Sequence, residues 1–162
     1  MKMSNFEGLE LISRRLNKIS VLSLLAVMIL INSSLVLAQS PTIRFAAIGD
    51  FGSGDNNQAS VANLVKSWNP DFIITLGDNN YPDGEAATID HTIGRFYHEY
   101  IFPYQGAYGP GSPYNRFFPS LGNHDWDNRV GMPAQPYLDY FVLPNNERYY
   151  DFVQGPVHFF VI

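Results

Sequence analysis

The sequence predicts an α/β fold, and three observations support this. Short apolar runs typical of buried strands occur at 43–48, 72–76 and 117–121. A helical pattern separates the first two runs, which gives a strand–helix–strand unit of ordinary length. Each run also stops at a glycine followed by a side chain that can bind metal. Parallel strands bring such ends together at one edge of a sheet, so the fold and a candidate site are predicted from the same residues.

The first half of the pattern is a βαβ unit. Thr42–Ile48 and Phe72–Leu76 are continuous apolar runs, so we expect both strands to be buried on both faces. A helix between them is expected to end at Asn69-Pro70, because proline cannot continue it. Its apolar residues recur at i, i+3, i+4 and i+7 and define the face expected to be buried: Val61, Leu64, Val65 and Trp68.

A second amphipathic helix and a long loop follow. The apolar positions of this helix are Ile89, Ile93, Phe96, Tyr97, Tyr100 and Ile101. Residues 102–116 hold three prolines and three tyrosines, which predicts a loop with its own aromatic packing. Because it precedes the third glycine motif, the loop is expected near the site. It is either a surface excursion whose aromatic rings pack on the domain or a substrate contact, and the first reading is favoured.

The last third predicts a short helix and a hairpin. Pro136–Phe141 is expected to be helical, and Arg148–Val153 and Val157–Ile162 are expected to pair across Gln154-Gly155-Pro156. The second hairpin strand has no acidic, lysine or arginine side chain. A bare apolar strand invites edge pairing, so we interpret residues 39–162 as the front portion of a larger α/β sandwich.

The first 38 residues have the layout of a secretory signal peptide. Three basic residues, Arg14, Arg15 and Lys18, precede a stretch from Ile19 to Leu37 without charge, and Val36-Leu37-Ala38 resembles a small-residue cleavage site. A retained membrane anchor is the alternative, since about 18 apolar residues can span a bilayer. We therefore expect residues 1–38 to direct export and residues 39–162 to be extracytoplasmic, secreted or periplasmic. The export route, general secretion or twin-arginine, stays open, as does oligomeric state.

Charge and cysteine content exclude several functions. Four of the ten basic and two of the fifteen acidic residues lie in 1–38, so the remainder has six against thirteen and a net charge of −7. No basic surface is left for a nucleic-acid backbone, so that partner is excluded. The chain has no cysteine, which excludes thiolate metal sites and cysteine nucleophiles. An acidic domain that binds phosphate needs metal ions to offset its own charge.

The three glycine motifs supply oxygen ligands. Gly49-Asp50-Phe51-Gly52, Gly77-Asp78-Asn79-Asn80-Tyr81 and Gly122-Asn123-His124-Asp125 each follow an apolar run. Carboxylate, amide and phenol oxygens with a nearby histidine suit hard or borderline cations. The glycines permit a sharp turn at each strand end and leave room for an ion.

With these three motifs in this order, residues 42–162 resemble the calcineurin-like metallophosphoesterases. Tyr81 in the second motif makes the sequence most similar to the purple acid phosphatase and tartrate-resistant acid phosphatase branch. The resemblance implies a four-layer α/β/β/α sandwich, here truncated after its first half. Further histidine ligands of that family belong to later motifs, beyond residue 162.

The resemblance also implies a role for each ligand. It makes Asp78 the bridge between two metal ions, places Asp50 and Tyr81 at the first ion, and places Asn123 at the second. A phenol near pKa 10 binds as phenolate only to a strong Lewis acid, so Tyr81 indicates ferric iron at the first site. Iron, zinc or manganese is implied at the second site.

His124 is the implied catalytic residue. The family uses this histidine to contact the phosphate and assist the leaving group, and a capping role is the alternative. Asp125 is expected behind it, orienting the imidazole. The remaining histidines, His91, His98 and His158, are expected to pack or lie on the surface, and the remaining aspartates of interest are expected in solvated turns: Asp55, Asp83, Asp127 and Asp151.

The sequence thus predicts a metal-dependent phosphoric ester hydrolase, similar to acid phosphatases. Its expected substrate is a phosphate monoester, attacked by metal-activated hydroxide at the dinuclear centre. The alternative is a non-catalytic, exported metal- or phosphate-binding fragment of such an enzyme. Whether this truncated chain is active stays open. No stable membrane partner is expected unless the leader is retained.

Overall fold

The computed structural model describes residues 14, 15, 17, 18, 20, 21, 23, 42–126 and 134–162. The chain divides into two units, Met1–Ser40 and Pro41–Ile162. The described residues of the first unit are helical, and the predicted signal peptide lies otherwise outside the described residues, as does Asp127. Among the described residues, no helix is long and apolar enough to cross a bilayer.

A three-stranded parallel sheet forms the centre of the second unit. The strand order is β1 (Phe45–Ile48), β2 (Phe72–Thr75) and β3 (Phe117–Phe118). Phe45 pairs with Phe72, and Ile73 pairs with Phe117. All three strands run in one direction, as the βαβ pattern predicts, so their carboxyl ends gather at one edge.

The strand boundaries and burial differ from the prediction in two ways. β1 is an edge strand, and it alternates between buried Ala46 and Ile48 and exposed Phe45 and Ala47. The expectation of burial on both faces is therefore wrong for β1 and correct for central β2, which has no exposed residue. β3 stops before Pro119, since proline has no N–H for the ladder.

Helix α2 (Asn56–Ser67) packs on the sheet with a different face from the predicted one. Its buried residues are Gln58, Ala62 and Val65. Three of the four predicted core positions are largely exposed: Val61, Leu64 and Trp68 at 43%, 53% and 48%. The periodicity was therefore correct for a helix and wrong for its orientation. Asp55 caps the helix by accepting from the N–H groups of Asn57 and Gln58.

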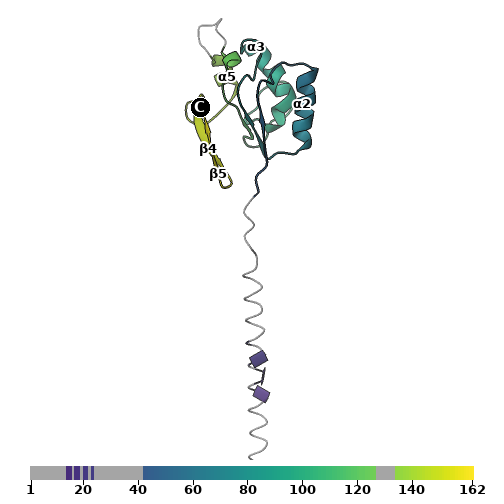
Figure 1. Ribbon diagram of the computed structural model, residues 1–162, viewed down its shortest axis with the longest axis vertical. Helices are drawn as coiled ribbons and strands as arrows, with labels where there is room; N and C mark the ends of the chain where they lie inside the picture. The colour runs from purple at the N-terminus through teal and green to yellow at the C-terminus, as the bar shows by residue number, and fades with distance from the viewer. Residues whose placement is uncertain (1–13, 16, 19, 22, 24–41, 127–133) are drawn as a thin grey trace, which may run out of the picture. The chain divides into compact units, whose positions relative to one another are not determined.

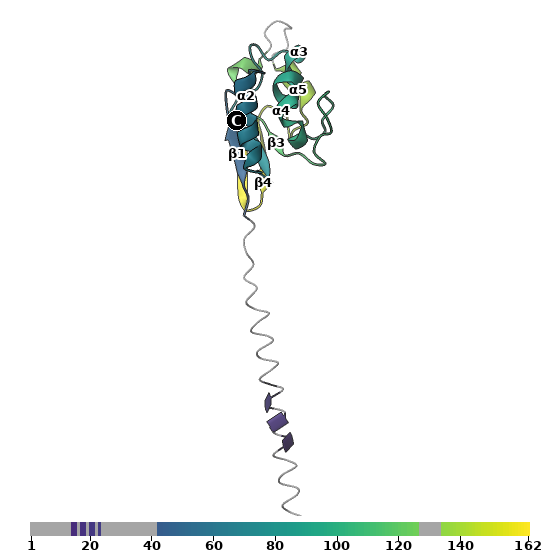
Figure 2. The same ribbon diagram turned by 90° about the vertical axis from the view of Figure 1, so that its right-hand side faces the viewer.

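The second predicted helix is one helical segment with changes of pitch. It consists of α3 (Ala86–Ile89), a π-helical turn η1 (Asp90–Gly94), α4 (Arg95–Tyr97) and a 3₁₀ turn η2 (His98–Tyr100). All six predicted apolar positions are buried. α2 and the α3–α4 segment lie side by side in Figures 1 and 2. They cover the same face of the sheet.

The hairpin covers the opposite face. β4 (Tyr150–Gln154) and β5 (Val157–Val161) pair antiparallel, as predicted. Figure 1 shows them across the sheet from α2. Phe152 and Phe159 stack on each other at 5.0 Å, and both contact Phe72 edge-on. The described layers are therefore α/β/β, which agrees with three layers of the predicted sandwich. α5 (Gln135–Tyr140) confirms the short helix.

Candidate metal centre

The ends of β1 and β2 turn through strained backbone at the two predicted carboxylate ligands. Asp50 has φ 53° and Asp78 has φ 55°, in the left-handed region that non-glycine residues seldom adopt. The Asp50 N–H donates to the Gly77 carbonyl at 3.1 Å, which continues the ladder past the strands. Strain of this kind concentrates at functional sites. Here it turns two aspartates out at the same edge.

Three oxygen atoms converge between these loops. The Tyr81 Oη lies 3.1 Å from Asp78 Oδ2 and 3.4 Å from Asp50 Oδ1. Burial, the hydrogen bond and charge of Asp78 and the charge of Asp50 raise the pKa of Tyr81 to about 12. Without a cation, the phenol therefore keeps its proton and screens two carboxylates from each other. A cation among these oxygens would relieve that repulsion and favour the phenolate.

Close packing of glycines fixes the spacing of the three loops. A Cβ on Gly52 would lie 1.9 Å from the carbonyl oxygen of Asn79. A Cβ on Gly122 would lie 2.3 Å from both the backbone nitrogen and the Oδ1 of Asp78. Both positions therefore require glycine, because the neighbouring atoms are backbone or the carboxylate of Asp78.

The third strand end meets the second at Asp78. The His124 N–H donates to Asp78 Oδ1 at 2.9 Å, so the two oxygens of Asp78 face different loops. Asn123 begins the 3₁₀ turn η3 (Asn123–Asp125), and its side chain is exposed. The structure therefore brings Asp50, Asp78 and Tyr81 into contact. Among the described residues, Asn123 is linked to them only through its chain neighbour His124, whose N–H contacts Asp78.

His124 is held by a backbone carbonyl. Its Nδ1 lies 2.6 Å from the carbonyl oxygen of Pro82, and its ring lies 4.4 Å from the Tyr81 ring. The carbonyl can only accept, so Nδ1 carries the proton and Nε2 is the remaining proton-transfer atom. The expectation that Asp125 orients this imidazole is wrong, since Pro82 does so.

Asp125 instead lies behind the site with Asn79. Its carboxylate accepts from Asn79 and from the Gly122 N–H, and it is only 2% exposed. Burial raises the pKa of Asp125, and the Gly122 and Asn79 hydrogen bonds offset this in part. Sequence reasoning missed Asn79. Its only signal was its place next to a predicted ligand.

The other histidines lie away from the strand ends. His91 Nδ1 contacts the Tyr108 hydroxyl, and His98 Nδ1 contacts the Pro110 carbonyl. Both therefore hold the 102–116 loop on the helical segment. This agrees with the packing interpretation of that loop. His158 lies 2.7 Å from Asp151 on the exposed face of the hairpin, so Asp151 is a paired strand residue and not the predicted turn residue.

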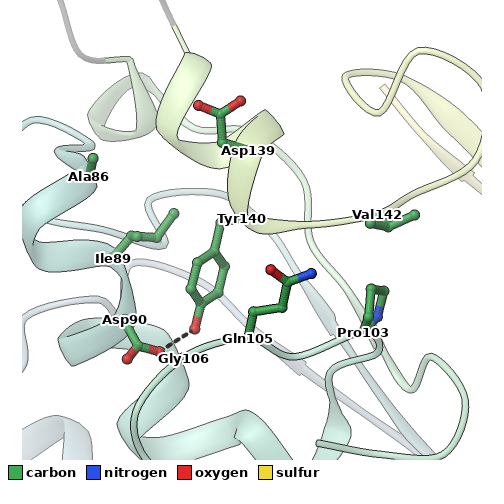
Figure 3. A pocket seen from close by; sticks show the side chains of 9 residues that line it. All are labelled: Ala86, Ile89, Asp90, Pro103, Gln105, Gly106, Asp139, Tyr140 and Val142. Carbon is green, nitrogen blue, oxygen red and sulfur yellow. Dashed lines mark hydrogen bonds between the residues drawn. The ribbon is translucent and has the colours of Figure 1, made fainter.

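A pocket of about 270 Å³ lies between α3, the 103–106 loop and α5. Figure 3 shows Asp90 at one side of it, with the Tyr140 hydroxyl donating to the carboxylate at 2.7 Å. Tyr104 and the Ala107 N–H donate to the same carboxylate. Asp90 is thus satisfied by internal donors, and its role is to fasten the loop and α5 to the helix.

The donor set at the strand ends fits one hard cation well. Within the described ranges, no group of three or more histidine, cysteine, aspartate or glutamate side chains gathers to hold a metal. The convergent oxygens belong to two aspartates and a tyrosine. Carboxylate and phenol oxygens suit hard cations. Asp78 and Asn123 offer a second ion fewer donors.

Comparison with known proteins shows which family the sequence matches. The family model of calcineurin-like phosphoesterases matches residues 43–160. Purple acid phosphatase 7 of Arabidopsis thaliana is 33% identical over 95 residues, covering 55% of this chain and 26% of that protein. Tartrate-resistant acid phosphatase type 5 of Mus musculus is 39% identical over 57 residues, covering 29% of this chain and 17% of that protein. The matches thus span about a quarter or less of these curated relatives.

Proposed function

Because the chain belongs to the calcineurin-like phosphoesterase family, we propose that it hydrolyses phosphate monoesters at a dinuclear metal centre, as acid phosphatases do. The observation that carries the proposal is the convergence of Tyr81 with Asp78 and Asp50. Asp50, Asp78 and Tyr81 would hold ferric iron. Asp78 and Asn123 would hold iron, zinc or manganese. Bound ions would neutralise phosphate charge and acidify the attacking water.

His124 has the geometry of a proton donor in this reaction. The Pro82 carbonyl holds Nδ1, so Nε2 is the atom that would face the ester. In the doubly protonated ring, Nε2 would give its proton to the leaving oxygen and return the ring to its neutral form. The half-buried ring lies against Tyr81, which restricts its orientation. Substrate binding and protonation would then take place at the edge where the strands end.

Export is the second part of the proposal. The basic residues and the uncharged run of the first 38 residues support a signal peptide. The mature domain would then work in an extracytoplasmic compartment. Detection of a mature chain beginning near Gln39 in the exported fraction tests this. A chain that keeps residues 1–38 in the membrane fraction would favour an anchor.

The alternative is non-catalytic metal or phosphate binding. The small number of described donors for the second ion favours it. Hydrolysis of p-nitrophenyl phosphate by the chain, loaded with ferric iron and zinc, distinguishes the two. The enzyme proposal predicts metal-dependent turnover that Asp78→Asn and His124→Ala abolish. Saturable binding of the ions or of inorganic phosphate without turnover would support the alternative.

A further inference from the structure

We propose that Asn79 and Asp125 are paired positioning residues that set the distance between the two metal sites. The inference rests on the proposed function, since it concerns the same ions. Neither side chain is expected to touch metal or substrate. Their role is to hold the turn that carries Asn123 against the loop that carries Asp78.

Two buried hydrogen bonds join Asn79 to Asp125. The Asn79 backbone N–H donates to Asp125 Oδ1 at 2.8 Å, and Asn79 Nδ2 donates to Asp125 Oδ2 at 2.9 Å. Asn79 is fully buried and Asp125 is 2% exposed. Charge-assisted hydrogen bonds that are shielded from water are stronger than exposed ones, and two parallel bonds fix an angle as well as a distance.

The same carboxylate also fixes the third strand end. The Gly122 N–H donates to Asp125 Oδ2 at 2.7 Å, so Asp125 closes its own turn around Asn123 and His124. Asn79 Nδ2 reaches the Ser120 carbonyl at 2.7 Å on the other side of the turn. The turn is therefore held at both ends, and this places the His124 N–H on Asp78 Oδ1.

The side-chain amide of Asn79 is held in one orientation, and this orientation is unfavourable for its oxygen. Both hydrogens of Nδ2 are used, while Oδ1 has no hydrogen-bond partner among the described residues. Rotating the amide by half a turn would place Oδ1 against the acceptor oxygens of Asp125 and Ser120. A buried polar atom without a partner is destabilising, and the two donor contacts to the third strand end offset this.

The pair acts on one of the two proposed ions more than on the other. The first ion uses Asp50 and Tyr81, which stand on the first and second loops and contact each other without Asp125. The second ion needs Asn123, which stands on the turn that Asp125 closes. The two hydrogen bonds between Asn79 and Asp125 thus act as a clamp. Loss of this clamp should weaken binding of the second ion and leave binding of the first unchanged.

Hydrogen exchange on the metal-free chain tests the geometry. In Asp125→Asn, an isosteric change, and in Asn79→Ala, the Gly122 and His124 amides should exchange about tenfold faster or more. The Ile73 and Ile74 amides of β2 should keep their protection. The matched control is Tyr150→Phe. It removes a buried hydrogen bond from the Tyr150 hydroxyl to the Pro119 carbonyl, and that bond does not join the Asp78 loop to the turn that carries Asn123. Its His124 amide should exchange as in the wild type.

Metal titration supplies a second readout. Ferric iron bound to the Tyr81 phenolate should give a visible absorption band, and both clamp variants should keep it. Both should bind zinc at least about tenfold more weakly than the wild type. Unchanged exchange at Gly122 and His124 would overturn the inference, as would uniformly faster exchange of all amides in Asp125→Asn. Loss of the ferric band together with zinc would also overturn it. A wild-type chain that binds neither metal contradicts the proposed function, and the exchange measurement then decides the clamp alone.

Discussion

The Tyr81 hydroxyl donates to Asp78 across 3.1 Å and lies 3.4 Å from Asp50. One phenol proton therefore lies between two carboxylates from different strand ends. Both aspartates have left-handed backbone, which the surrounding loops must hold in place. An arrangement that raises the pKa of Tyr81 to about 12 is unfavourable for phenolate without a cation, and it becomes favourable once a cation occupies the centre.

Asp78 should be the ligand whose loss costs most. Its Oδ2 faces Tyr81 and its Oδ1 faces the third loop, so it is placed to contact both ions. Asp78→Asn should lower the occupancy of both metals together, whereas Asp50→Asn and Asn123→Ala should each lower mainly one. Elemental analysis of protein dialysed after loading measures this. Two ions retained at wild-type occupancy in Asp78→Asn would contradict the bridging role.

Asp90 should contribute pH-dependent stability. Burial raises its pKa, but hydrogen bonds from Ala107, Tyr104 and Tyr140 outweigh burial and hold the pKa below 3.8. A carboxyl whose pKa is lower in the folded state stabilises the fold above its unfolded pKa, and this stability is lost as the pH falls below 3.8 through the folded value.

Asp90→Asn should therefore destabilise the chain by about 2 kcal/mol at pH 7. The difference from the wild type should shrink as the pH falls below 3.8. Urea unfolding at several pH values measures it. Asp139→Asn, across the same pocket but exposed, is the matched control and should change stability little. A pH-independent difference for Asp90→Asn would show that its charge is not involved.

Gly52→Ala should disrupt the site more than the sheet. The new Cβ would meet the Asn79 carbonyl at 1.9 Å, so the first and second loops must separate. We expect a loss of about 2 kcal/mol in unfolding free energy and loss of ferric binding. Gly49→Ala is the milder control, because its Cβ would meet a side-chain atom of Leu76 at 3.1 Å. Equal metal binding by both variants would contradict the proposal that close packing at Gly52 sets the spacing of the first two loops.

The outer face of the hairpin should promote self-association. Phe160 and Val153 are 70% and 61% exposed, and the His158–Asp151 pair interrupts this surface only in part. Phe160→Lys should increase the monomer fraction seen by light scattering without loss of secondary structure. Phe159→Lys is the contrasting control, because Phe159 packs on Phe72 and its loss should unfold the hairpin. An unchanged monomer fraction in Phe160→Lys would exclude this surface.

Much of the fold could be predicted because local patterns and tertiary packing agree. The apolar positions 89, 93, 96, 97, 100 and 101 are all buried, even though a π-helical turn interrupts the helix. For α2 the pattern predicted the helix but not its buried face, because apolar residues lie on several faces of that helix. The exposure of Ala47 depends on how much of the sheet other elements cover, and it is not encoded in β1 itself.

The candidate site was predictable where chemistry is local. The glycine–aspartate pairs place carboxylates directly after two strands, and the order of residues alone fixes this. The partners of Asp125 and His124 were not predictable, because Asn79 and Pro82 approach them from another loop. Such contacts depend on how loops interlock in three dimensions, and one sequence carries no signal for them.

The most direct test of the proposed metal centre is the visible spectrum of the chain loaded with ferric iron. Tyr81 should bind as phenolate and give a charge-transfer band, which Tyr81→Phe should remove while the circular dichroism spectrum stays unchanged. Tyr108→Phe, a change on the 102–116 loop, should keep the band. A band that persists in Tyr81→Phe, or a chain that binds ferric iron without colour, would contradict the assignment of this strand-end centre.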